Sequence, residues 1–483
     1  MAYIPQLKVL SDAQVAKLHE KGVEILQRFG MQVEDPEIRT MLVDAGNSCE
    51  GDRIYFDPDF IQKVIENNQH PILLKSPKGS AVELAMGKTL THSTGGAPWM
   101  VDGVTGKRRN ALSQDLVDCI KLMNQLPNLD LPCALVYPDD VAPNITQFVQ
   151  TAMMLEHSSK PIDGPGISTA INGKYIAELF KLYGHTEDNP IGMANISPES
   201  PLMLPKEITD TMRHIVGAGI PVSALSAPMG GLTAPLTVLG TVAQCHAEIL
   251  AFAAVAYLIN PKTAIIYASR CFFANMKTGE SILGLPETGY SSAIAAQLAN
   301  YLGWTSDFYG FAGTSCALDQ QTGYEKMMNG MLPALAGATL ITGYGSIGSV
   351  MCASLSQLVL DDEMAGMVKR VMRPNSAFDF DKFDEEEIDE YLGFDAIECV
   401  VDEGEIFLEQ EHTVEYLYKD EIYVPKVGFD SLFAEYIKRG EPSITAVAEE
   451  KAKSLLAKDD VAPIDAALKA EVEQLIAAAE REM

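Results

Sequence analysis

Aromatic, basic and histidine side chains recur at the ends of short apolar runs along the middle of this sequence. His92 closes the run 89–93, Tyr137 closes 131–137, and Arg270 follows 263–269. If these runs are parallel strands of a barrel, their carboxyl ends meet on one face, where barrel enzymes place their chemistry. Rings that converge there suit a cation without N–H donors, because quaternary ammonium is held mainly by cation–π attraction. The rings that could form such a cage are Trp99, Tyr137, Tyr267, Phe308, Tyr309 and Tyr344.

An anion could be held near the same ends. Arg270 is the candidate side chain for a carboxylate. The segment GYGSIG at 343–348 matches G-x-G-x-x-G, and acids follow at 361–362. Those acids lie within LSQLVLDDEMAGMVKR, which reads as one helix, whereas a dinucleotide fingerprint needs its acid at the end of a second strand. We therefore expect the backbone around Gly343, Gly345 and Ser346 to bind a substrate anion instead of a dinucleotide.

Other reactive side chains give weaker signals. His92, between Thr91 and Ser93, is the one histidine placed to contact substrate, and Cys316 has no sequence-adjacent base. Asp139, Asp163 and Glu199 also follow predicted strands and could act as acids or bases. Neither H-x-x-x-H, H-x-C nor H-E-x-x-H occurs, so we expect no metal site.

The elements that would position these residues alternate regularly. Eight short apolar runs are each followed by a helical stretch, which favours a closed (β/α)₈ barrel over the alternative, a doubly wound open sheet. The predicted strands are 89–93, 131–137, 160–163, 189–196, 221–226, 263–269, 306–312 and 339–344. The predicted helices are 113–125, 144–158, 171–183, 206–217, 236–259, 288–302, 320–336 and 354–371.

The alternation of strands and helices covers only the middle of the sequence, so the chain divides into three parts. Residues 1–87 form an α+β extension that begins with a helix over 11–30, and residues 88–375 form the barrel. Residues 376–483 form an acidic segment, an alternating stretch at 412–425 and two amphipathic helices at 443–456 and 466–481. The loops after the first and sixth strands are long, as expected of loops that shape a pocket.

Composition excludes several classes of function. With 36 basic and 66 acidic residues, the net charge of −30 argues against nucleic acid and anionic membrane surfaces as partners. The eight cysteines include no C-x-x-C pair, which is typical of a reduced, intracellular protein. The N-terminus shows no secretory signal, and the apolar stretch 247–259 is short and contains Glu248. We therefore expect a cytoplasmic protein.

Four long segments resemble the trimethylamine methyltransferase superfamily of corrinoid-dependent enzymes. They are LPETGYSSAIAAQLANYLGWTS (285–306), LDQQTGYEKMMNGMLPALAGATLI (318–341), LVLDDEMAGMVKRV (358–371) and KSLLAKDDVAPIDAALKAEVEQLIAAAE (453–480). The likeness covers nearly the whole chain. It implies a (β/α)₈ barrel, in agreement with the count of strands, and together with the apolar faces of the tail helices it favours a homo-oligomer.

The sequence departs from the trimethylamine enzymes at one place. Those enzymes carry pyrrolysine after the seventh strand, where this chain has Cys316 or a residue beside it. Members without pyrrolysine resemble demethylases of quaternary amines such as glycine betaine, proline betaine, carnitine or γ-butyrobetaine. The resemblance implies methyl transfer to the Co(I) corrinoid of a separate protein. In keeping with this, the chain lacks the D-x-H-x-x-G motif of cobalamin-binding domains, and we expect no tightly bound cofactor.

Two other functions stay open from the sequence. One is a barrel lyase or hydrolase that uses Asp139, Asp163 or Glu199, which would need two carboxylates in one pocket with different pKa values. The other is a betaine-binding protein without catalysis, against which the lack of a signal peptide and the size of the barrel argue.

Overall fold

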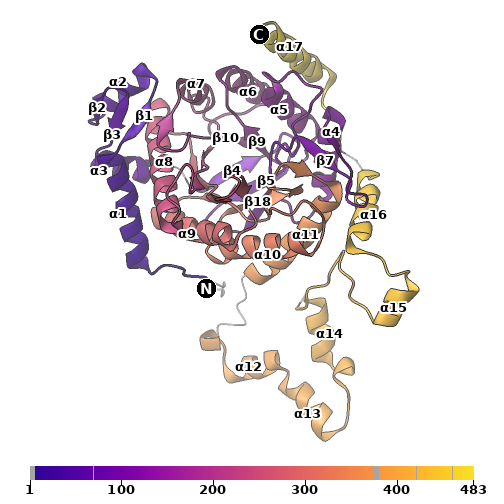
Figure 1. Cartoon of the computed structure of the whole chain (residues 1–483). Coiled ribbons are helices and arrows are strands. Elements are labelled where there is room, and N and C mark those ends of the chain that lie inside the picture. Colours follow the sequence, from indigo (N-terminus) through magenta and orange to yellow (C-terminus); the bar gives the residue numbers. More distant parts are fainter. Residues whose placement is uncertain (1–5, 69, 374–379, 420, 459–460, 483) are drawn as a thin grey trace.

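The computed structural model describes residues 6–68, 70–373, 380–419, 421–458 and 461–482. Its centre is a ring of parallel strands surrounded by helices (Figure 1). Seven strands are hydrogen-bonded in the spatial order β6-β18-β17-β14-β12-β10-β9. They are β6 (Leu90–Ser93), β9 (Ile162–Gly166), β10 (Gly192–Ile196), β12 (Val222–Ser226), β14 (Ile265–Ser269), β17 (Ser306–Tyr309) and β18 (Leu340–Tyr344).

An irregular segment fills the second strand position and completes the ring. Leu131 forms a parallel bridge with His92, and on the other side the backbone N–H of Asp163 donates to the carbonyl of Pro132 at 3.0 Å. Pro132 has no N–H of its own, so a regular ladder is interrupted where the sequence predicted a strand. The strands follow one another around the ring in chain order, which confirms the predicted (β/α)₈ barrel.

Eight helices lie outside the strands and agree closely with the predicted ranges. They are α4 (Ser113–Gln125), α5 (Thr146–His157), α6 (Ala170–Leu182), α7 (Lys206–Ile215), α8 (Val238–Ile259), α9 (Pro286–Leu302), α10 (Gln320–Leu335) and α11 (Leu355–Met372). Within the described residues, α8 is the one helix long and apolar enough to cross a membrane, and 83% of that stretch is buried inside the protein. Burial on all sides explains its uniform apolarity.

A hairpin closes the N-terminal end of the barrel. It consists of β4 (Ile72–Lys75) and β5 (Ala81–Leu84), and the N–H of Lys75 donates to the carbonyl of Pro190 at 2.9 Å. Ile72, Leu74 and Leu84 pack in one buried cluster with five residues of the barrel, Leu131, Met193, Ala264, Ile266 and Leu340. The lower end of the barrel therefore has an apolar core.

The N-terminal extension lies against one side of the barrel (Figure 1). It contains α1 (Asp12–Arg28), β1 (Met31–Val33), α2 (Pro36–Asp44), β2 (Ser48–Glu50), β3 (Arg53–Tyr55) and α3 (Pro58–Asn67). Ser11 caps α1 in a capping box with Gln14, as the predicted start at residue 11 requires. Strand β1 pairs with β11 (Met203–Leu204), which joins the extension to the barrel loops.

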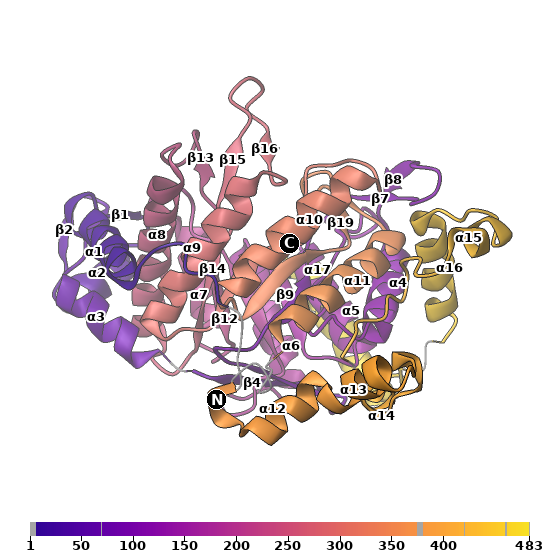
Figure 2. The same ribbon diagram turned by 90° about the horizontal axis from the view of Figure 1, so that it is seen from below.

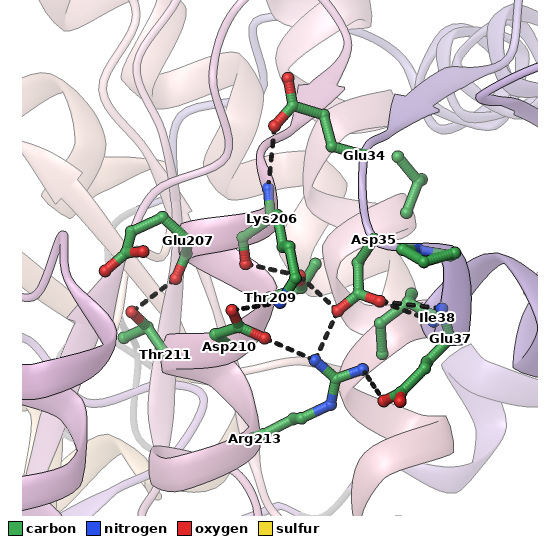
Figure 3. A network of polar contacts seen from close by, with 12 residues as sticks. Glu34, Asp35, Glu37, Ile38, Lys206, Glu207, Thr209, Asp210, Thr211 and Arg213 are labelled. Atoms are coloured by element: carbon green, nitrogen blue, oxygen red, sulfur yellow. Dashed lines mark hydrogen bonds and ion pairs between the residues drawn. The ribbon is translucent and has the colours of Figure 1, made fainter.

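A polar network fixes this attachment (Figure 3). Arg213 of α7 forms ion pairs with Asp35, with Asp210 at 2.7 Å and with Glu37 at 2.9 Å. Asp35 also caps α2 and accepts a hydrogen bond from Thr209 at 3.1 Å. The side chain of Asp35 is 1% exposed, so these bonds replace the water that its carboxylate loses.

Two small sheets rise from the C-terminal end of the barrel, on one side of the molecule (Figure 2). One contains β7 (Trp99–Val101), β8 (Arg108–Asn110), β19 (Ser346–Ile347) and β20 (Cys352–Ala353). The other contains β13 (Met229–Gly230), β15 (Phe272–Ala274) and β16 (Ser281–Ile282). The long first and sixth loops therefore fold into the rim of the barrel mouth.

The C-terminal part continues as short helices along the lower edge in Figure 2 and then returns to the barrel. The predicted boundary at 375–376 lies outside the described residues. The helices are α12 (Glu385–Leu392), α13 (Phe394–Asp402), α14 (Glu411–Tyr418), α15 (Phe433–Lys438), α16 (Ile444–Leu456) and α17 (Ala466–Glu482). The alternating stretch from 412 is helical as far as Tyr418. Helix α16 packs on α11 and α4, and α17 packs on α6.

Candidate active site

A cavity of about 300 Å³ opens at the C-terminal mouth of the barrel. Its walls come from the ends of β6, β9, β10, β12, β17 and β18, from the segment that fills the second strand position, and from α5. The side chains that enter it sit on strand ends because successive residues of a strand point to opposite faces, so that every second residue faces the barrel interior.

His92 lies at the floor of this cavity, between two carboxylates. Its Nε2 is 2.7 Å from Oδ1 of Asp307, and its Nδ1 is 2.9 Å from Oδ2 of Asp163. All three side chains are at most 3% exposed. Burial alone would lower the pKa of His92, but the two carboxylates outweigh it and raise that pKa to about 9. His92 is therefore an imidazolium at neutral pH, and its charge is matched inside the site.

Arg270 joins the network from the end of β14. Its Nη2 forms an ion pair with Oδ2 of Asp307, and its Nη1 donates to the carbonyl of Asp307 at 2.8 Å. Burial would raise the pKa of Asp307, yet Arg270 and His92 together lower it to about 2. The guanidinium carbon of Arg270 also lies 5.1 Å from the centre of the Tyr309 ring, within cation–π range.

Asn195 connects the network to β10. Its Nδ2 donates to Oδ1 of Asp163 and to the carbonyl of Gly164, both at 2.7 Å. Two cations, His92 and Arg270, thus face two anions, Asp163 and Asp307. Each carboxylate oxygen of the two aspartates has a partner, so the network is closed and electrically balanced.

The predicted aromatic cage residues fall into two groups. Tyr137 and Tyr309 line the cavity, and the hydroxyl of Tyr137 donates to the carbonyl of Pro143 at 2.9 Å. Tyr267 and Phe308 pack on each other behind the barrel wall, where the hydroxyl of Tyr267 lies 3.0 Å from Nδ1 of His246. They point outward because they alternate with inward-facing neighbours on β14 and β17.

The other two predicted rings also lie away from the cavity. The hydroxyl of Tyr344 donates to the carbonyl of Asn128 at 3.2 Å, and its ring packs edge-on against Phe311. Trp99 belongs to the rim, where the guanidinium of Arg108 lies 4.2 Å from the centre of its ring. Neither ring is among the cavity walls.

The predicted anion-binding loop holds a carboxylate of the chain itself. The N–H of Gly345 donates to Oδ2 of Asp361 at 2.7 Å, and the hydroxyl of Ser346 donates to the carbonyl of Gly343 at 3.0 Å. Lys326 pairs with Asp361 at 2.8 Å, and both side chains are 0% exposed. Asp361 lies on α11, as the sequence predicted, and occupies the place where we expected a substrate anion.

Cys316 and two of the candidate acids lie outside the cavity walls. Cys316 is exposed in the loop after β17. Its sulfur lies close to Gly348, 3.5 Å from where a Cβ of that residue would be. Asp139 accepts a hydrogen bond from Asn110 at 2.9 Å, and Glu199 forms an isolated bridge with Met203. Of the three candidate acids, only Asp163 enters the cavity.

Sequence reasoning missed Asp307 and Asn195, although a signal for both was present. Asp307 is two residues before Tyr309 on β17, and residues two apart on a strand share a face.

In the part of the chain that the structure describes, no group of three or more His, Cys, Asp or Glu side chains could hold a metal ion.

Comparison with known proteins agrees with this architecture. A family model described as trimethylamine methyltransferase (MTTB) matches residues 1–483. Glycine betaine methyltransferase of Desulfitobacterium hafniense (strain Y51) is 28% identical over 445 residues, which cover 90% of this chain and 89% of that protein. Trimethylamine methyltransferase MttB of Methanosarcina thermophila is 29% identical over 480 residues, which cover 95% of each.

A solved structure shares the fold. The crystal structure of the Methanosarcina barkeri monomethylamine methyltransferase (MtmB) matches with a TM-score of 0.53 and 14% sequence identity, over 94% of this chain and 89% of that one. The match of the family model over the full length, together with the barrel, leads to one conclusion. The chain belongs to the trimethylamine methyltransferase (MTTB) family.

Proposed function

We propose that this protein transfers a methyl group from a quaternary amine of betaine type to the corrinoid of a separate protein. Membership of a methyltransferase family supports the reaction type. The observation that carries the choice of mechanism is the closed network of His92, Arg270, Asp163 and Asp307, whose charges satisfy one another. A quaternary ammonium already has a tertiary amine as leaving group, so the site needs to bind and orient the substrate without transferring a proton.

Two features of the cavity suit such a substrate. Tyr137 and Tyr309 offer ring faces to the ammonium, and the carboxylate of Asp163 adds negative charge to the same wall. Arg270, at the opposite end of the ion-pair network, is the candidate partner for a substrate carboxylate. The volume of about 300 Å³ is the lower end of what small-molecule sites typically offer.

The rim of the barrel suits a docking protein. Exposed apolar side chains stand on the turns of the two rim sheets and on the loop before α8, namely Val104, Leu232, Leu236, Met276 and Met351. When the partner docks there, its Co(I) corrinoid supplies the nucleophile that accepts the methyl group. The protein would then act as a homo-oligomeric, cytoplasmic enzyme without a tightly bound cofactor of its own, built from the three parts that the sequence predicted.

The lyase or hydrolase alternative is less well supported. It would need two carboxylates with separate roles in one pocket, and Asp139 and Glu199 do not line the cavity. Asp163 and Asp307 do share the site, but His92 lies between them and is within ion-pair distance of both carboxyl groups. A betaine-binding protein would use the same cavity and would differ from the enzyme only in not demethylating the bound betaine.

The test is methyl transfer from a panel of quaternary amines to free Co(I) cobalamin, followed by the change in the cobalamin absorption spectrum. We expect at least one betaine to be demethylated, and none to be hydrolysed. In the Arg270→Gln variant, carboxylate-bearing amines should lose more kcat/KM than choline, which has no carboxylate. Tight binding of a betaine without any methyl transfer would support the binding protein, and release of a cleaved substrate without cobalamin would support the hydrolase.

A further inference from the structure

The cavity contains an acceptor that the chain leaves without a donor. Asn195 is 4% exposed, and both hydrogens of its Nδ2 are used, since Nδ2 donates to Asp163 and to the carbonyl of Gly164. These two bonds fix the orientation of the amide. Its Oδ1 is buried and receives no hydrogen bond from the described residues. A buried carbonyl without a partner is costly, so this oxygen requires a donor from outside the chain.

Three side-chain donors of the surrounding wall are directed elsewhere. Nε2 of Gln150 donates to the carbonyl of Val136 at 2.7 Å, and Oγ1 of Thr342 donates to the carbonyl of Ser93 at 3.2 Å. The hydroxyl of Tyr137 is likewise used by a backbone carbonyl. None of these groups can turn to Asn195 without giving up its present bond.

A second unpartnered polar group lies beside Asn195. Ser223 of β12 is the in-register neighbour of Asn195, it is 0% exposed, and its hydroxyl has no partner among the described residues. Ser223 is two residues before Leu225, which lines the cavity, so both face the barrel interior. Ser223 itself is not part of the cavity wall, so the acceptor that a bound group meets directly is the Oδ1 of Asn195.

The chemistry of the missing group follows from this acceptor. It must donate to the Oδ1 of Asn195, and a hydroxyl is a donor that a quaternary amine can carry. A quaternary ammonium has no N–H, and a carboxylate at neutral pH has no hydrogen to donate. We propose, on the basis of the proposed function, that the site selects quaternary amines that carry a hydroxyl group, and that Asn195 is the residue that recognises this hydroxyl.

The first test uses the unmodified protein and two amines that differ in one hydroxyl. Calorimetric titration with carnitine and with γ-butyrobetaine should give about ten-fold or tighter binding of carnitine, since the deoxy compound leaves the buried carbonyl unpaired. Choline against ethyltrimethylammonium repeats the comparison without a carboxylate. Equal affinity within each pair would overturn the inference, because it would mean that a water molecule satisfies Asn195 and Ser223.

Variants locate the preference on Asn195. In Asn195→Ser, the ratio of carnitine to γ-butyrobetaine affinity should fall to about one, while in Asn172→Ser it should stay at the value of the unmodified protein. Asn172 is an equally buried asparagine on α6, where it accepts from the N–H of Phe148 outside the cavity, and so it controls for general destabilisation. A ratio unchanged in Asn195→Ser would assign the preference to another group.

The outcome also separates this inference from the proposed function. Methyl transfer to cobalamin at equal kcat/KM from the hydroxylated and deoxy amines would leave the proposed function standing and overturn the role of Asn195. Failure to bind or demethylate any quaternary amine would overturn both.

Discussion

Replacement of His92 by asparagine should change how the stability of the protein depends on pH. In the folded protein, the pKa of His92 is raised from 6.5 to about 9 by the two carboxylates, which outweigh the effect of burial. A raised pKa means that the folded state binds the proton more tightly than the unfolded chain. The resulting stabilisation is fully present below pH 6.5 and is lost as the pH rises through 9.

The magnitude follows from the size of that rise. At about 1.4 kcal/mol for each pH unit, a rise from 6.5 to about 9 corresponds to about 3 kcal/mol of stability. This is a large fraction of the total stability of a typical domain. The same interaction lowers the pKa of Asp307, so the two shifts describe one contribution and are not added.

Urea denaturation at several pH values between 6 and 10 measures the effect. The free energy of unfolding of the unmodified protein should fall by about 3 kcal/mol more across this range than that of His92→Asn. His70→Asn is the matched control, because burial lowers the pKa of His70 to about 4 and it stays neutral throughout the range. Parallel curves for the unmodified protein and His92→Asn would refute the assignment of a charged His92.

Three further changes test other parts of the structure. Asp361→Asn should lower the free energy of unfolding by about 3–5 kcal/mol in urea denaturation, because it leaves a buried lysine unpaired, and a loss below about 1 kcal/mol would contradict this. Tyr309→Leu should weaken quaternary amine binding by about two- to thirty-fold in calorimetric titration, whereas Tyr267→Leu should change stability more than affinity. Gly22→Ala should lower the melting temperature measured by calorimetry, since the new Cβ would lie 2.4 Å from a histidine ring carbon, while Gly323→Ala, with nothing within 4 Å, should not.

The helices and most strands were predictable because their patterns are local. Helix α4 has the predicted range of 113–125, since its apolar residues recur at the helical period and face one buried side. The second strand was only partly predictable. Its apolar run is present, but the loss of a ladder at Pro132 depends on the neighbouring strands, which the sequence does not place.

The site was predictable in part. The sequence did not show which face of each strand points into the cavity. Tyr309 and Tyr267 both lie within predicted strands, yet only Tyr309 faces the cavity, because one step along a strand reverses the side chain. The expectation of an anion site at 343–348 shows a different limit. Gly343 and Gly345 do have positive φ, but the N–H of Gly345 donates to Asp361 of the chain itself, and no local pattern tells an internal carboxylate from a substrate.

The hairpin β4–β5 has a kinetic consequence. Because it covers the lower end of the barrel with an apolar layer, the cavity opens at the mouth, and under the proposed function the amine, the demethylated amine and the partner would all use that one face. A single opening would impose an order on binding and release. On the proposed function, the amine would have to enter before the partner docks, and the product would leave after the partner does, so a high concentration of partner should slow turnover by trapping the product or blocking the empty site.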